Sequence, residues 1–168
     1  MATTLPCYSY MTASTSLRVL YREITNNPTK ILNLKLHRRN GPTKFKFIQI
    51  EGIANLILQN IFIYTENSTT LSNDVCINII NCSKVNLDNI TIENLYEADK
   101  TYAYGIALDN CSMLFINKFN SYNNNWGITG NNNLNQVYVS NSHINRFDVH
   151  CYGKNITFDN CVFYKLYN

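Results

Sequence analysis

Four chemically capable residues alternate along one short segment, RFDVHCY, which runs from Arg146 to Tyr152. Because successive side chains of a β-strand point to opposite faces, Arg146, Asp148, His150 and Tyr152 would share one face. An aspartate can orient a histidine or stabilise its charge, an arginine can bind a carboxylate, and a tyrosine can exchange a proton. The spacing predicts a catalytic cluster of Asp148, His150 and Tyr152 with Arg146 binding substrate. The alternative interpretation is a surface ion pair of little energetic weight.

Small residues precede this cluster in the repeats described below. Our alignment places Ala107 and Thr129 in line with His150, and Gly105 and Gly127 in line with Asp148. Such a strip predicts a shallow groove that ends at the large polar residues. Thr129 is therefore a candidate substrate-binding residue.

Asp109 is a second acidic candidate. It shares an outward column with Glu51, about 9.6 Å away at the usual strand separation, which is the wide limit for an inverting glycosidase pair. Ile80 lies between them and argues against a catalytic pair, so Asp109 is interpreted as substrate-binding. Asp148 is expected about 16 Å from Asp109, too far for a direct pair.

A repeat positions these residues. Five segments align from an apolar anchor, with spacings of 29, 29, 22 and 21 residues, and the anchors are Ile48, Ile77, Ile106, Ile128 and Val149. Each segment contains two short alternating strand patterns separated by a polar turn, and none contains a long helical period. The repeat predicts an all-β, right-handed parallel β-helix, a solenoid of about five to six coils.

The positions two residues on either side of each anchor carry further apolar side chains, which predict stacked core columns. Tyr104, Trp126 and Phe147 are expected to form an aromatic stack in this core; a sugar platform at Trp126 is the alternative. An asparagine recurs near the second strand of most repeats and predicts ladders of left-handed turns, at Asn60, Asn89, Asn117, Asn141 and Asn160.

The chain divides into an N-terminal lead-in or cap over residues 1–29 and a parallel β-helix domain over residues 30–168. The last strand pattern runs almost to Asn168 without a capping pattern. Since a bare solenoid end exposes unpaired strand edges, two alternatives follow. Either a partner covers this end, or the domain is incomplete at its C-terminus.

Composition limits the function. The chain has 168 residues with only 15% charged side chains, while 28 residues are asparagine, which favours extended structure over exposed helices. The net charge of +3 hides a basic segment over 30–46, a candidate docking surface. This segment lacks aromatic interleaving and zinc spacing, so we expect no nucleic-acid partner. No apolar run is long enough to span a membrane.

The six cysteines form no CxxC pair, and no histidine stands at metal-ligand spacing. We therefore expect no metal site and no cofactor. Several cysteines occupy positions where an apolar residue would also serve, which predicts free, buried thiols in a chain made in a reducing cytosol.

The runs WGITGNNN from Trp126 and NRFDVHCYGKNITFDNCVF from Asn145 resemble the pectate-lyase-like β-helix of bacteriophage tailspike or tail-fibre polysaccharide depolymerases, particularly the colanic-acid-degrading type. The segment YGIALDNC from Tyr104 resembles an earlier coil of that family. The similarity covers about residues 75–168, and RFDVHCYG is its most specific part.

This resemblance implies a virion tail component, made in the bacterial cytoplasm and acting at the host surface as a homotrimer or larger tail assembly. It implies a glycoside hydrolase or polysaccharide lyase that binds and cleaves capsular or exopolysaccharide around Arg146, Asp148, His150 and Tyr152. The alternative is a non-enzymatic structural or glycan-binding β-helix protein of a virion or cell surface. A third hypothesis is a partner-docking module that uses the basic segment.

Overall fold

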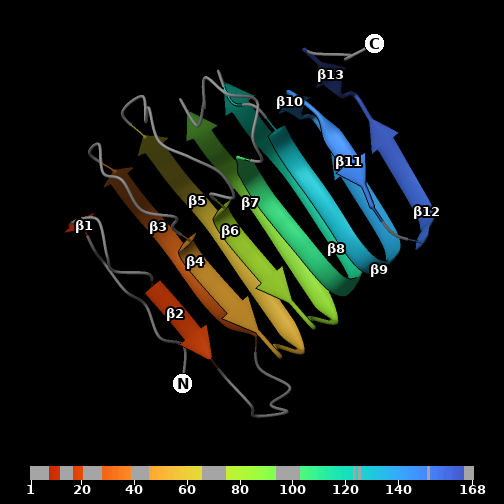
Figure 1. The fold of residues 1–168 in the computed structure, drawn as a ribbon, viewed down its shortest axis with the longest axis horizontal. Coiled ribbons are helices and arrows are strands. Elements are labelled where there is room, and N and C mark those ends of the chain that lie inside the picture. The colour runs from red at the N-terminus through yellow and green to blue at the C-terminus, as the bar shows by residue number, and fades with distance from the viewer. Residues whose placement is uncertain are drawn as a thin grey trace.

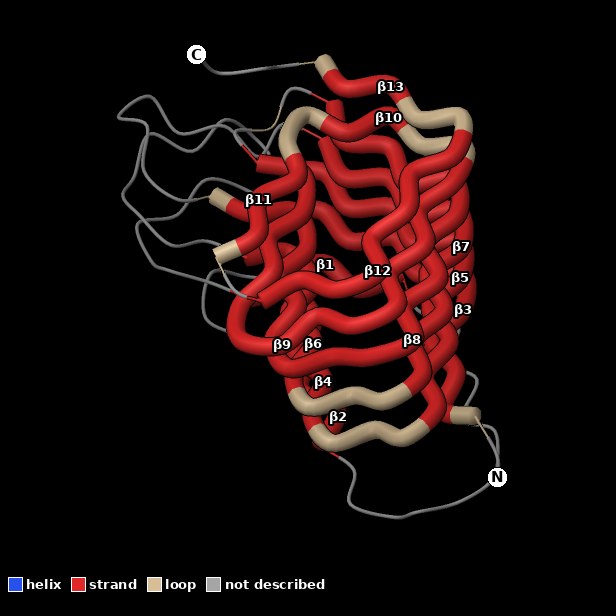
Figure 2. Tube along the Cα trace, turned by 90° about the vertical axis from the view of Figure 1, so that its right-hand side faces the viewer, coloured by secondary structure: helices blue, strands red, loops and turns tan. Residues whose placement is uncertain are grey.

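The fold is a stack of parallel β-strands wound into a solenoid, seen face-on in Figure 1 and from the side in Figure 2. The computed structural model describes residues 8–11, 17–20, 28–38, 46–65, 75–93, 103–122, 124, 126–150 and 152–164. Within these ranges every regular element is a strand and every strand pairing is parallel. The predicted all-β parallel solenoid is confirmed. The described residues include no helix long and apolar enough to cross a membrane.

One face of the solenoid, which we call the first face, carries the candidate site. Its strands pair in the order β2, β4, β6, β8, β9, β11. The bounds are β2 Leu17–Leu20, β4 Lys46–Glu51, β6 Val75–Ile80, β8 Tyr104–Tyr122, β9 Trp126–Ser140 and β11 Phe147–Val149. The long strands β8 and β9 continue around the bend onto the next face.

The remaining strands complete each coil. The second sequence of pairing runs through β3, β5, β7, the later parts of β8 and β9, and β12. Three short strands, β1, β10 and β13, lie further along the coil. Strand β1 pairs with β3, and β10 pairs with both β8 and β13. The bounds are β1 Tyr8–Met11, β3 Thr29–Arg38, β5 Asn55–Thr65, β7 Lys84–Glu93, β10 His143–Ile144, β12 Tyr152–Asp159 and β13 Val162–Phe163.

The segment expected as a lead-in, residues 1–29, contributes β1, β2 and the first residue of β3 to this sheet. The two N-terminal strands thus extend the same parallel pairing toward the N-terminal end of the stack (Figure 1).

The core consists of apolar columns that run through the stack. The anchor residues Ile48, Ile77, Ile106 and Ile128 are register partners and are fully buried, as predicted. Each such side chain contributes roughly 1.5–3 kcal/mol by leaving water. The column two residues on, from Ile50 to Gly130, is also in the predicted register.

Asparagine ladders close the bends between faces, as predicted. Asn60 adopts φ of 56°, donates a side-chain hydrogen bond to Asn33 (2.8 Å) and accepts one from Asn89 (2.9 Å). Asparagine tolerates this left-handed backbone better than other non-glycine residues. One predicted member differs, because the positive φ falls on Lys118 rather than on Asn117. Asn117 still takes part in the ladder, because it accepts a hydrogen bond from Asn141.

The described cysteines are free thiols, as expected. Cys76, Cys82 and Cys111 are buried, and Cys161 is half-buried. Cys7 and Cys151 lie outside the described residues.

Candidate functional site

The outward side of β11 brings three of the predicted residues together. Asp148 lies between Arg146 and His150, and its Oδ2 atom is 3.7 Å from Arg146 Nη2 and 2.7 Å from His150 Nε2. The side chains of Arg146, Asp148 and His150 are 32%, 16% and 50% exposed. The Asp148 carboxylate is therefore the most buried group of the cluster, and the His150 imidazole is the most exposed.

The aspartate–histidine contact is close but not an aligned hydrogen bond. Asp148 Oδ2 is buried and accepts no hydrogen bond of acceptable geometry from the described residues, although His150 Nε2 lies within ion-pair distance. An N–H on Nε2 that pointed at this oxygen would donate a hydrogen bond to it. With that alignment, the imidazole can exchange a proton at its other nitrogen while the carboxylate stabilises the charged ring.

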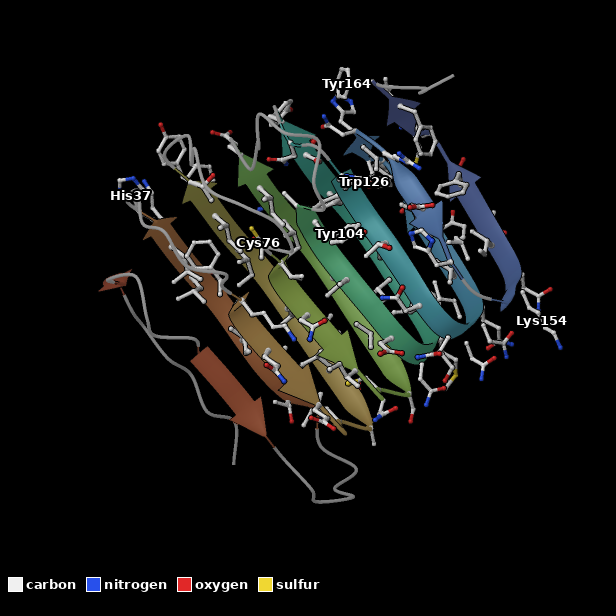
Figure 3. All side chains as sticks on the ribbon, in the orientation of Figure 1. His37, Cys76, Tyr104, Trp126, Lys154 and Tyr164 are labelled. Atoms are coloured by element: carbon white, nitrogen blue, oxygen red, sulfur yellow. The ribbon has the colours of Figure 1, made fainter. Side chains whose placement is uncertain are left out.

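Arg146 is held by an aromatic ring as well as by Asp148. Its guanidinium carbon lies 3.4 Å from the centroid of the Trp126 ring, a cation–π contact that fixes a planar charge next to the cluster. Trp126 in turn packs on Tyr104, with 5.5 Å between ring centroids. Figure 3 shows Tyr104 and Trp126 together on the neighbouring strands β8 and β9.

The aromatic stack differs from the prediction at its third member. Tyr104 and Trp126 are half-buried, and Phe147 does not continue their column. Phe147 pairs with Ile128 instead, and its ring packs nearly perpendicular to that of Phe158, with 5.0 Å between the ring centroids. The predicted stack of three rings is therefore a pair of rings capped by Arg146.

The register of β11 explains this difference. The sequence alignment placed Val149 in the anchor column, whereas Phe147 is the partner of Ile128 and Val149 is the partner of Gly130. The backbone confirms the shift, because Ile128 N donates to Arg146 O (2.9 Å) and His150 N donates to Gly130 O (2.9 Å). A slip of two residues keeps every side chain on the same face. The alternating pattern could not reveal it.

The shift changes which residues surround the cluster. Asp148 is aligned with Thr129 and Ala107, not with Gly127 and Gly105. His150 follows the Val149–Gly130 pair, so it continues the column of Asn131 and Asp109. The sequence alignment of His150 with Thr129 was therefore wrong by two residues.

The small-residue strip is packed rather than open. Thr129 is 1% exposed, and its Oγ1 atom has no hydrogen-bond partner among the described residues. A Cβ on Gly127 would meet Ile144 Cγ2 at 2.7 Å, and a Cβ on Gly105 would meet the backbone oxygen of Gly127 at 2.7 Å. These glycines permit close packing of the coils, and the expected open groove over Thr129 is not formed.

Asp109 lies apart from the cluster, two coils from His150. Its carboxylate accepts a hydrogen bond from Asn132, whose left-handed backbone places the amide beside it. Glu51, Ile80 and Asp109 form one column, as predicted.

The side chain of Tyr152 lies outside the described residues, so its predicted role stays a prediction. No group of three or more His, Cys, Asp or Glu side chains in the described ranges could hold a metal ion.

Sequence reasoning missed the Arg146–Trp126 contact. Its signal was present, since Trp126 precedes its coil's anchor by two residues and Arg146 precedes Phe147, the true anchor, by one. The contact between Arg146 and Trp126 could be predicted only with the correct register of β11.

Neither a protein-family model, nor a curated protein, nor a solved structure matches this chain. The class is therefore set by the fold itself: the chain is a parallel β-solenoid with a charged cluster on the last strand of its first face.

Proposed function

We propose that this chain is a carbohydrate-directed component of a phage tail, which binds and cleaves bacterial capsular or exopolysaccharide at the Arg146, Asp148 and His150 cluster. The observation that carries the proposal is the 2.7 Å approach of the half-exposed His150 ring to the sheltered Asp148 carboxylate. The resemblance of residues 75–168 to tailspike depolymerases supports the assignment to a virion tail at the host surface. It also supports a homotrimer, and a right-handed winding is proposed because parallel crossovers take that hand in nearly all proteins.

Elimination fits the cluster better than hydrolysis. In a lyase, Arg146 would bind the carboxylate of a uronate and His150 would remove the proton next to it, after which the neighbouring glycosidic oxygen leaves and a double bond remains. A hydrolase needs a second carboxylate within about 9.5 Å. In the observed register Asp109 is two coils and two residues from Asp148, roughly 12 Å between Cα positions. We therefore favour a lyase.

The test measures cleavage of acidic exopolysaccharides, read as new reducing ends and as absorbance of an unsaturated uronate. We expect His150→Ala to lower the rate at least 100-fold, as loss of a proton-transferring group does. Asp148→Asn should lower the rate as well, because the amide cannot stabilise a charged ring. His143→Ala is the matched control, since His143 lies on β10 and contacts Tyr164, and this variant should cleave at the parent rate.

A second candidate is a non-enzymatic, glycan-binding or structural β-helix protein. It is favoured by the burial of Thr129 and Ala107, which removes the groove expected beside the cluster. Trp126 is the single tryptophan of the chain, so its fluorescence reports a glycan that displaces Arg146. Binding without cleavage would favour the glycan-binding form of this candidate, and neither binding nor cleavage would contradict the depolymerase and leave only the structural form.

A further inference from the structure

Two buried thiols occupy equivalent bends in successive coils. Cys82 and Cys111 follow Asn81 and Asn110, whose positive φ values of 53° and 50° turn the chain between faces. Each cysteine is 2% exposed. Each sulfur lies 3.3 Å from the backbone oxygen two residues earlier in its own coil.

The two sulfurs are neighbours across the coils. Ser112 N donates to Cys82 O at 3.1 Å, and Val85 pairs with Leu114 three residues further on, which makes Cys82 and Cys111 register partners. Cys111 Sγ also lies 3.5 Å from the backbone oxygen of Ile79. The next residue, Ile80, carries the oxygen that Cys82 Sγ contacts. Both thiols therefore occupy the same small space beneath the bend.

The contact between the two thiols shifts the pKa values of both. A hydrogen bond between the side chains lowers the pKa of Cys82, while the same bond together with burial raises the pKa of Cys111. A lower pKa increases the share of Cys82 in the thiolate form, which is the form that attacks a disulfide.

The backbone spacing suits a covalent link. Neighbouring strands lie about 4.8 Å apart, which falls within the roughly 4.4–6.8 Å between Cα atoms that disulfides span. We propose that Cys82 and Cys111 form a disulfide that joins two successive coils once the chain meets a small-molecule disulfide outside a reducing cytosol.

The oxidation is a balanced exchange. The Cys82 thiolate attacks oxidised glutathione, forms a mixed disulfide and releases one glutathione thiolate. Cys111 then attacks the Cys82 sulfur and releases the second glutathione. One protein S–S bond forms, two protein thiols lose their hydrogens, and one oxidised glutathione becomes two reduced molecules.

The register places residues other than cysteine next to the remaining described cysteines. Cys76 lies on β6 between positions occupied by Phe47 and Gly105. Cys161 follows Asn160 at a bend of the same kind, but the corresponding residue of the preceding coil is Ser142. The proposed link therefore joins the bend that follows β6 to the equivalent bend within β8.

The link would act on unfolding. It closes a loop that contains β7, so it reduces the freedom of the unfolded chain and holds two coils together. The oxidised protein should unfold at a higher denaturant concentration than the reduced protein.

The experiment refolds the denatured, reduced chain in a glutathione redox buffer, where access of the oxidant to the bend does not limit the reaction. Free thiols are then alkylated, and the digest is mapped by mass spectrometry. We expect a cross-linked peptide pair containing Cys82 and Cys111, two hydrogens lighter than the reduced pair, and a denaturation midpoint that falls on adding reductant. If refolding yield is low, the native protein is oxidised in denaturant below its transition and mapped in the same way.

Serine variants provide matched controls, because Ser142 shows that serine fits after a left-handed asparagine and donates to the oxygen two residues earlier (2.6 Å). Cys82→Ser and Cys111→Ser should each abolish the cross-link and the reductant-dependent shift. Cys161→Ser should preserve both. Alkylation of both Cys82 and Cys111 in the refolded protein, or a bridge to a different cysteine, would overturn the proposal.

Discussion

The middle coils and the last coil have the same alternating pattern of apolar residues, but their apolar side chains differ in how deeply they are buried. The column of Leu58, Leu87, Ile116 and Val139 is fully buried, because each member has a coil on both sides. Its next member, Phe158 in β12, is 38% exposed. The candidate site lies at this less covered end of the stack, on β11. Among these residues, those of the middle coils bury more apolar surface than Phe158 does.

The largest expected effect is on the core column itself. Leu87→Ala should destabilise the protein by about 3 kcal/mol, because it removes buried methyl groups and leaves a cavity between two coils. Phe158→Ala should cost less than about half as much, because its ring is already partly in water. Urea denaturation of the two variants measures this difference.

Equal losses for Leu87→Ala and Phe158→Ala would contradict the comparison. Such a result would mean that the last coil is as well covered in solution as the middle ones. Phe158→Leu is a useful control, because it keeps an apolar side chain in the column and should lie between the parent and Phe158→Ala.

A smaller effect is expected along the asparagine ladder. Asn60→Ala should cost about 2 kcal/mol, because alanine disfavours the left-handed turn and two ladder hydrogen bonds are lost. Asn160 has the same backbone, and within the described ranges its side chain makes one ladder hydrogen bond, to Asn141, so Asn160→Ala should cost closer to about 1 kcal/mol. Thermal or urea denaturation separates the two variants.

The ladder also allows a gain. Lys118→Asn places an amide at the one bend of this series where lysine has the left-handed conformation, and it should stabilise the protein by about 0.5–1 kcal/mol. A loss of stability in Lys118→Asn would indicate that the lysine side chain contributes more than its backbone strain costs.

The smallest expected effect lies on the exposed surface of the last two coils. The hydroxyl of Tyr138 donates to Asp159 Oδ2 at 3.0 Å, and this hydrogen bond, followed by the nearby negative charge, raises the pKa of Tyr138. The folded state therefore favours the neutral phenol. Its contribution is present below the unfolded value of about 10 and is lost as the pH rises through the higher folded value.

Tyr138→Phe should reduce the loss of stability above about pH 10, measured as the urea midpoint against pH. Tyr122→Phe, which changes an exposed tyrosine on a different part of the coil, is the control. Identical pH profiles for Tyr138→Phe and the parent would show that the hydrogen bond to Asp159 does not persist in solution.

The parallel solenoid could be predicted because its physical requirements repeat. Every coil must place apolar residues at alternate positions, as at Ile77 and Ile79, and must bend at a residue that accepts a left-handed backbone, as at Asn89. Both signals recur at matching intervals along the chain. The structure keeps them in the predicted register from β4 to β9.

The grouping of three charged side chains could be predicted from the sequence. The alternation around Asp148 correctly grouped Arg146 and His150 on one side of β11. Its neighbours were missed, because Phe147 and Val149 are both apolar and a two-residue slip satisfies the pattern equally well. The burial of Thr129 was also missed, since a sequence pattern shows which face a side chain takes but not what packs over that face.

The asparagine bends have a consequence for how such a chain can lengthen. Apart from the bend at Lys118, the bends of this series have a left-handed asparagine and an amide contact to the neighbouring coil, whether 27, 29 or 19 residues separate the two asparagines. Connections of different lengths can therefore be inserted between coils without altering the amides that hold neighbours together. A whole coil could be duplicated or removed as a module, and its neighbours would meet through an identical joint.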